Sequence, residues 1–131
     1  MTAPAWRLRV AAVALFAATA CFHNGPQPDE DVDIRPDPIP IRVINENYLD
    51  MNVYMVANSV TRRLGTVNGN GKGDFSVPWS AVASSSVTLV GVPIGGSGRA
   101  VSGALNVGVG QAISFRIAST LRQSVAILED P

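Results

Sequence analysis

The chain has 131 residues, of which 47% are hydrophobic and 15% are charged, and its formal net charge is +0. This length limits it to one ordinary domain, and the composition excludes disorder throughout and a protein with several membrane spans. The composition also argues against nucleic-acid binding. The largest basic cluster is the pair Arg62-Arg63, so an affinity based on counterion release has no visible source.

Residues 1–20 have the pattern of an export signal. Arg7 and Arg9 form a positively charged start, and an apolar stretch of about eleven residues follows from Val10. A stretch of that length is too short to span a bilayer. The small-x-small sequence Ala18-Thr19-Ala20 predicts cleavage directly before Cys21, which is the only cysteine.

The segment Ala18-Thr19-Ala20-Cys21 resembles the lipobox of bacterial lipoproteins, with Ala18 at the position where leucine is commonest. The resemblance implies that the Cys21 sulfur carries a diacylglyceryl group and that the new amine is acylated. Two or three acyl chains, at about 0.8 kcal/mol per buried CH₂, anchor a protein permanently to a membrane. The alternative is an ordinary secretory signal that leaves a free thiol at Cys21, from which an exported protein gains nothing obvious because a single cysteine forms no internal disulfide.

Residues 21–38 are rich in proline and acidic side chains, which predicts an extended, solvated tether. Its acidity would keep the folded part away from an anionic lipid surface. In the Gram-negative lipoproteins that this region resembles, an aspartate directly after the acylated cysteine marks retention at the inner membrane. Phe22 stands there, which implies the outer membrane. His23, the only histidine, has no second ligand nearby and receives no role.

Residues 39–131 contain short apolar runs separated by turn-forming residues, and these predict seven or eight β-strands. In chain order the predicted strands are Ile39–Asn45, Met51–Ala57, Ser59–Val67, Asp74–Val77, Ser85–Pro93, Ala100–Val107, Ala112–Ala118 and Val125–Leu128.

Two turn signals predict how neighbouring strands are joined, and one glycine predicts an irregularity within a strand. The polar sequence of residues 46–50 predicts a hairpin between the first two strands. Gly65 interrupts the third strand and predicts a bulge or bend. The two Asn-Gly pairs within Asn68–Gly73 predict a tight hairpin turn into the fourth strand.

This spacing predicts an all-β domain, an antiparallel β-sandwich of immunoglobulin-like architecture, with a small β-barrel as the alternative. The paired cysteines around a tryptophan that mark true immunoglobulin domains are missing from the sequence. The domain resembles small β-domains of bacterial lipoproteins, without a motif that transfers a function. The predicted core comprises Val43, Val53, Met55, Leu64, Val87, Leu89, Leu105, Ile113, Phe115, Ile117 and Ile127.

The glycine-rich loop Asn68–Gly73 can be compared with two known binding motifs. A phosphate-binding loop would need glycine where Thr66 stands and a hydroxyl residue where Gly73 stands. Asn68, Asn70 and Asp74 could offer oxygens to calcium, but Lys72 brings a positive charge into the same loop.

Nucleophilic and acid catalysis find no support either. Ser97 and Ser102 lack the Gly-x-Ser-x-Gly frame, and the predicted domain has no histidine. The carboxylates at Glu46, Asp50, Asp74, Glu129 and Asp130 read as exposed loop charges. The sequence therefore predicts a protein that is not an enzyme, with no catalytic, cofactor-binding or metal-binding residues.

Binding remains the open class of function. Tyr54 is predicted to face away from the core, where Arg62, Arg63 and Arg99 could join it in a surface for a protein or a glycan. Of the remaining aromatic residues, Phe75 and Trp79 are expected to close the ends of the sandwich, and Tyr48 is given no separate role.

Two functions remain. The first is an envelope lipoprotein whose β-sandwich acts in protein binding or as a structural component of the envelope, for example through an unpaired edge strand. The second is a lipoprotein that binds a small ligand or carbohydrate near Asn68–Gly73 and Gly95–Arg99.

Overall fold

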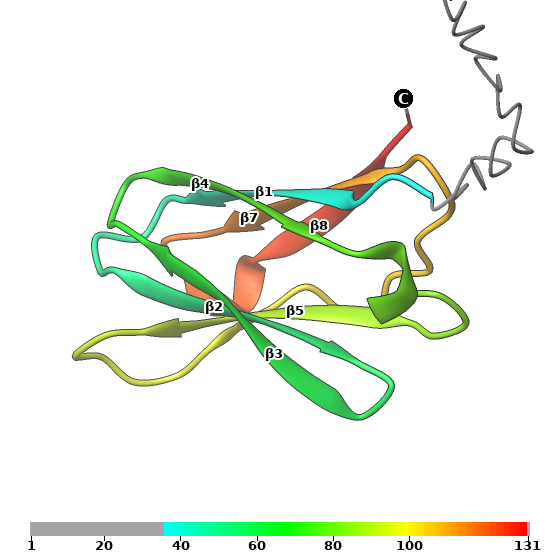
Figure 1. Ribbon diagram of the computed structural model, residues 1–131. Helices are drawn as coiled ribbons and strands as arrows, with labels where there is room; N and C mark the ends of the chain where they lie inside the picture. Colours follow the sequence, from blue (N-terminus) through cyan, green and yellow to red (C-terminus); the bar gives the residue numbers. More distant parts are fainter. Residues whose placement is uncertain (1–35, 131) are drawn as a thin grey trace, which may run out of the picture. The chain divides into compact units, whose positions relative to one another are not determined.

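The computed structural model describes residues 36–130, which fold into two packed β-sheets (Figure 1). Eight strands and two short 3-10 helices make up this part of the chain, and neither helix is long and apolar enough to cross a membrane. The predicted signal peptide, Cys21 and most of the predicted tether lie outside the described residues.

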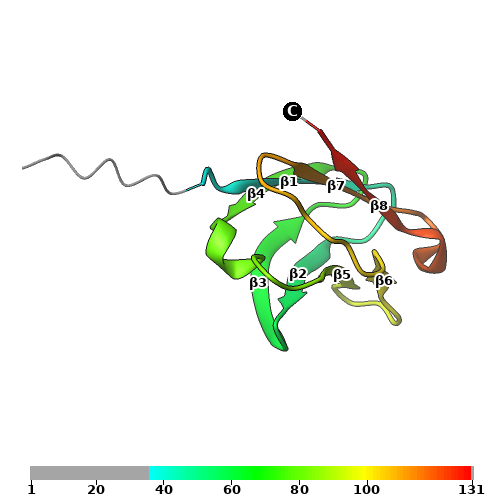
Figure 2. The same ribbon diagram turned by 90° about the vertical axis from the view of Figure 1, so that its right-hand side faces the viewer.

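Each sheet has four strands among the described residues. Sheet A has the order β4 (Lys72–Val77), β1 (Ile39–Asn45), β7 (Ala112–Ile117) and β8 (Val125–Glu129). Sheet B has the order β3 (Val60–Val67), β2 (Met51–Ala57), β5 (Val87–Pro93) and β6 (Ala100–Val101). The helices η1 (Trp79–Ala81) and η2 (Leu121–Gln123) lie between β4 and β5 and between β7 and β8. Figure 2 shows the strands of sheet A above those of sheet B, which confirms the predicted sandwich and excludes a closed barrel.

One strand pair differs from the predicted antiparallel arrangement. Five of the six strand pairs within residues 36–130 are antiparallel, whereas β1 and β7 pair in parallel, with Val43 beside Phe115. A parallel pair needs a long crossover connection. The chain between β1 and β7, which includes all of sheet B, supplies it.

The core fills the space between the two sheets. Along β1 and β2, every second residue is buried, as expected where one face of a strand meets the core and the other meets water. Eight predicted core residues are buried: Val43, Val53, Met55, Val87, Leu89, Ile113, Phe115 and Ile117. Leu64 and Leu105 are partly buried and pack against this core.

The prediction that Ile127 belongs to the core is wrong. Ala126 and Leu128 take the inward positions of β8, and Ile127 is 56% exposed on the outer face. The run Val125–Leu128 is apolar throughout, so it has no alternation from which the buried side could be read.

The predicted hairpin between the first two strands is also wrong, because β1 and β2 lie in different sheets. Residues 46–50 cross from sheet A to sheet B instead. Each strand alternates buried and less buried residues, a pattern that a hairpin and a crossover between facing sheets share.

The first true hairpin joins β2 and β3. Asn58 and Ser59 both have positive φ, of 51° and 61°, as a two-residue type I′ turn requires. The predicted irregularity at Gly65 is confirmed: Val53 faces Gly65 and Tyr54 faces Arg63, so Leu64 is an extra residue in β3.

The Asn-Gly segment after β3 is a turn, but it does not form a hairpin. It leads from β3 in sheet B to β4 in sheet A, which pairs with β1. Phe75 of β4 covers this corner, because a Cβ added to Gly65 would lie 2.6 Å from its Cε1 atom. The sequence identifies the turn but not the sheet that receives the next strand.

The predicted strand Ala100–Val107 is shortened to two residues of β6. Gly103 has a φ of +80°, which interrupts the extended backbone. Beyond it, Leu105 forms an isolated antiparallel bridge with Val87.

Candidate functional site

The crossover between the sheets is organised by the side chain of Asn45, which is 1% exposed at the end of β1. Its Nδ2 donates hydrogen bonds to the carbonyl oxygens of Leu49, at 2.8 Å, and Asn68, at 3.0 Å. Its Oδ1 accepts a hydrogen bond from the backbone N–H of Asn47, at 3.0 Å. One buried amide therefore joins the crossover to the turn after β3.

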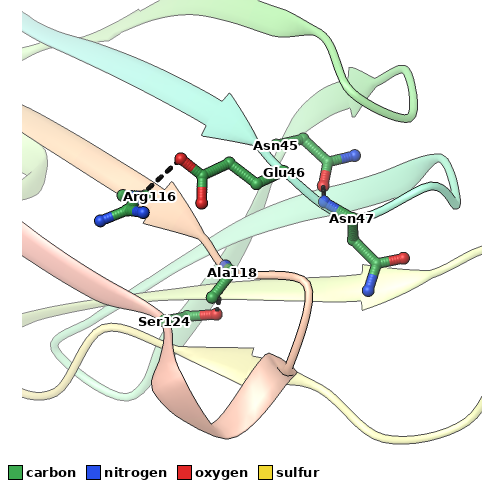
Figure 3. A network of polar contacts seen from close by, with 6 residues as sticks. All are labelled: Asn45, Glu46, Asn47, Arg116, Ala118 and Ser124. Atoms are coloured by element: carbon green, nitrogen blue, oxygen red, sulfur yellow. Dashed lines mark hydrogen bonds and ion pairs between the residues drawn. The ribbon is translucent and has the colours of Figure 1, made fainter.

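Asn47 extends this network to a third connection. Its Nδ2 donates to the carbonyl oxygen of Ser119, after β7, at 2.9 Å. Its Oδ1 accepts from the backbone N–H of Leu49, and its carbonyl oxygen accepts from the backbone N–H of Asn70. Figure 3 shows Asn45 and Asn47 on one side of the crossover and Glu46 pointing the other way, toward Arg116. The network is structural, since each bond satisfies a backbone group.

The two loops expected to bind a ligand do lie at one end of the sandwich. Asp50 connects them, because its Oδ1 accepts from the backbone N–H of Gly69 and its carbonyl oxygen accepts from Ile94, both at 2.8 Å. The carbonyl oxygen of Asn68 is already bonded to Asn45 and to the N–H of Gly71. Within residues 36–130, no group of three His, Cys, Asp or Glu side chains could hold a metal ion.

Two exposed ion pairs lie on sheet A and beside it. Arg42 Nε donates to Asp74 Oδ1 at 2.9 Å, and Arg116 Nε donates to Glu46 Oε1 at 2.7 Å. The hydrogen bond from Arg116 lowers the pKa of Glu46 and, reciprocally, raises the pKa of Arg116. The hydrogen bond to Asp74 likewise raises the pKa of Arg42. Glu46 is thus held as a charged acceptor, the opposite of the protonated form that a general acid needs.

Of the two serines considered as nucleophiles, Ser102 has a structural task. Its Oγ accepts a hydrogen bond from the N–H of Leu89 at 2.8 Å and donates to the carbonyl oxygen of Gly103 at 2.7 Å. It thereby continues the pairing of β5 where β6 ends. Ser97 is exposed in the loop between these two strands.

The outer face of sheet B carries a shallow hollow of about 270 Å³, which we call the Tyr54 face. It is lined by Tyr54, Val56, Thr61, Val90, Val92 and Arg99. Arg63 lies beside Tyr54 in the register of β2 and β3, and its Nη2 donates to Asn52 Oδ1 at 3.0 Å. The structure therefore confirms that Arg63 and Arg99 share a face with Tyr54.

Arg62 does not belong to that face. It is opposite the buried Met55 and lines a separate hollow with Ser80 and Ala81 of η1. The aromatic rings of Phe75 and Trp79 are partly buried and pack against the core. Tyr48, in the crossover, is 78% exposed.

The four edge strands differ in how they are protected against pairing with another chain. Edges are commonly blunted by charged side chains, proline, bulges or shortness. β3 carries Arg62, Arg63 and a bulge, β4 begins with Lys72 and is followed by Pro78, and β6 has only two residues.

The fourth edge, β8, has only one of these features, the charged Glu129 at its C-terminal end. Its sequence is VAILE, without lysine, proline or glycine, and no described strand pairs with its free side. Val125 is 47% exposed and Ile127 is 56% exposed on its outer face. β8 is therefore the edge within residues 36–130 that is most open to an added strand.

Comparisons with known proteins add no functional assignment. No protein-family model matches the chain, and no curated protein matches it. Among solved structures, the chain is similar to one described as the NMR structure of the protein from Eubacterium rectale. The TM-score is 0.46 at 17% sequence identity, and the match covers 82% of this chain and 97% of that one.

Proposed function

We propose that the protein is a lipoprotein of the bacterial cell envelope, anchored through an acylated Cys21, whose β-sandwich binds another protein and has no catalytic role. The lipobox-like segment Ala18-Thr19-Ala20-Cys21 supports the anchor, and Phe22 after it supports the outer membrane as the destination. The acidic, proline-rich residues 21–38 suit a tether between lipid and domain.

The open edge at β8 is the observation that carries the binding part of this proposal. An edge strand presents unpaired backbone N–H and C=O groups, to which an extended segment of a partner can add as a further strand. Val125 and Ile127 would then contact alternate side chains of that segment.

The anchor is tested by the intact mass of the N-terminal peptide from protein purified out of its native membrane. We expect a peptide that begins at Cys21 and carries the added mass of two or three acyl chains. The variant Cys21→Ser should leave the membrane fraction. An unmodified Cys21 at the N-terminus would overturn the anchor and leave a soluble exported sandwich.

The binding part is tested by cross-linking in intact cells, comparing the parent chain with Ile127→Lys. A lysine on the free edge should abolish the cross-linked complexes, because it charges the surface that a partner strand must cover. Val109→Lys is the matched control, since Val109 is 65% exposed in the loop before β7. Equal cross-linking in all three chains would exclude β8 as the binding edge.

A second candidate function is the binding of a carbohydrate or small ligand, which the Tyr54 face favours. An aromatic ring, a threonine hydroxyl and an arginine line one hollow there. Titration with a panel of glycans, comparing the parent chain with Tyr54→Ala, tests it. Saturable binding that Tyr54→Ala removes and Ile127→Lys retains would favour this function over protein binding.

A further inference from the structure

We propose that the partner strand of β8 is β8 of a second copy of this chain, paired antiparallel about Ile127 so that two copies of sheet A become one continuous sheet. This inference rests on the proposed function, because it names the partner of the same edge. It follows from the sequence of the strand, from the order of large and small side chains along it, and from the charges at its two ends.

In one register, β8 is complementary to itself. With Ile127 facing Ile127 of the second copy, all five residues of each strand are paired. On the outer face, the exposed Ile127 side chains then cover each other. On the inner face, the small Ala126 lies opposite the larger Leu128, so each copy offers a gap where the other offers bulk.

The charges at the two ends of β8 also favour antiparallel pairing. Glu129 and Asp130 stand at the end of β8, whereas Arg122 of η2 stands shortly before its beginning; the nearby Arg116 is already paired with Glu46. Antiparallel pairing places the acidic end of one copy beside the basic end of the other. A parallel pairing would put Glu129 beside Glu129 and would not form a closed two-fold dimer.

The charged side chains near the two ends of β8 are accessible to a second copy. Arg122 and Glu129 are exposed, and neither forms an ion pair within residues 36–130, although Glu129 lies near enough to Arg42 to contribute to the raised pKa of that residue. In a two-fold dimer, Arg122 of each copy would lie near Glu129 of the other, which gives two equivalent contacts between opposite charges. Attachment of both copies to one membrane would raise their effective concentration, so that the pairing of two five-residue strands would be enough to hold the dimer together.

The test uses the mature chain, residues 21–131, carrying Cys21→Ser, which removes the acylation site, so that neither the apolar signal nor copies sharing a detergent micelle can imitate a dimer. Sedimentation analysis over a concentration series should show a monomer–dimer equilibrium. Ile127→Lys should raise the dimer Kd at least about tenfold, since it sets two ammonium groups opposite each other. Val109→Lys should leave the Kd unchanged.

A charge exchange tests the register. Arg122→Glu alone and Glu129→Arg alone should each weaken the dimer, by about threefold at low salt. A 1:1 mixture of the two variants should restore it, because every contact between unlike copies then joins opposite charges. A mixture as weak as the separate variants would overturn the antiparallel register.

The outcomes also separate this inference from the proposed function. A chain that stays monomeric at about 1 mM, the effective concentration that tethering provides, overturns self-pairing. If Ile127→Lys still abolishes cross-linking to a different envelope protein, the function stands and only the partner is wrong. If Ile127→Lys changes neither self-association nor cross-linking, both proposals fail.

Discussion

At the scale of single residues, buried asparagines decide how the connections of this sandwich are held. Asn45 is buried among apolar core residues, where an amide is costly unless its hydrogen bonds are made. Its donors and acceptor serve the backbone of Leu49, Asn68 and Asn47. These bonds fix the crossover and the turn after β3 against each other, so loops without regular structure gain a defined position.

Replacing Asn45 with alanine should lower the free energy of unfolding by about 1–3 kcal/mol, because the buried N–H of Asn47 loses its acceptor and the part-buried carbonyl oxygens of Leu49 and Asn68 each lose a donor. Urea denaturation measures the change. Asn52→Ala is the control, since its Oδ1 accepts only from exposed side chains, and it should cost less than about 1 kcal/mol. Equal losses in the two variants would show that the buried network contributes no special stability.

At the scale of elements, the corner between β3 and β4 depends on one aromatic ring lying against glycines. A Cβ at Gly65 would lie 2.6 Å from Phe75 Cε1, and one at Gly73 would lie 3.2 Å from Phe75 Cζ. These glycines are therefore needed for close approach, since neither has a positive φ. The same ring covers the bulge in β3, which ties the irregular edge of sheet B to sheet A.

Gly65→Ala should destabilise the protein by about 1–3 kcal/mol, because the new methyl group overlaps the Phe75 ring. In a Phe75→Leu background the same change should cost less, and a double-mutant cycle should give a coupling of at least about 0.5 kcal/mol. Gly108→Ala serves as the control, because its added Cβ would lie 3.2 Å or more from the Gln111 side chain and would meet no aromatic ring. Additive effects of the Gly65 and Phe75 changes would contradict this packing.

At the scale of the whole molecule, charge is divided unevenly between the two sheets. The strands of sheet B contain arginines and no acidic residue, whereas the ion pairs found within residues 36–130 lie on sheet A and its crossover. We therefore expect that acid changes the stability of the folded domain through the ion pairs of sheet A and its crossover. Glu46 is the informative group, because its pKa is lowered by the hydrogen bond from Arg116.

A lowered pKa in the folded state means that the Glu46–Arg116 pair stabilises the fold above the unfolded pKa of about 4.3. This contribution is lost as the pH falls through the folded pKa. Glu46→Gln should thus lower Tm slightly at pH 7 and have no effect once Glu46 is protonated. The effect should be small and weaker in high salt, because both side chains are well exposed.

Thermal unfolding of the parent chain and Glu46→Gln between pH 2 and pH 7 measures this difference. Arg116→Gln should reproduce the same pH dependence, since it removes the other partner. A difference in Tm that persists unchanged at the lowest pH would show that Glu46 acts through packing and not through its charge.

Sequence reasoning located most strands because their signal is local. The alternation of Ile113, Phe115 and Ile117 with less buried residues identifies a strand with one face in the core, and the structure confirms it. Gly65 marked a bulge for the same reason, since a glycine interrupts a pattern within a few residues. Tyr54 was placed on the outer face by the period of two along β2.

The connections and the candidate edge required the tertiary structure. Residues 46–50 and Asn68–Gly73 look like hairpin turns, yet both carry the chain between sheets, because turn chemistry does not specify which strand the next one pairs with. Asn45 and Asn47 have no signature apart from their position, since their partners are distant backbone groups.

By itself, the sequence determined the all-β class, the number of strands and most of the core, because these follow from periodicity and turn residues close together in the chain. Only the tertiary structure decided that β1 pairs in parallel with β7, that Ile127 faces outward, and that β8 is an open edge. These features depend on which strands far apart in the chain become neighbours. The strand neighbours are determined by the simultaneous burial of the inner faces of both sheets, and no local sequence pattern contains that information.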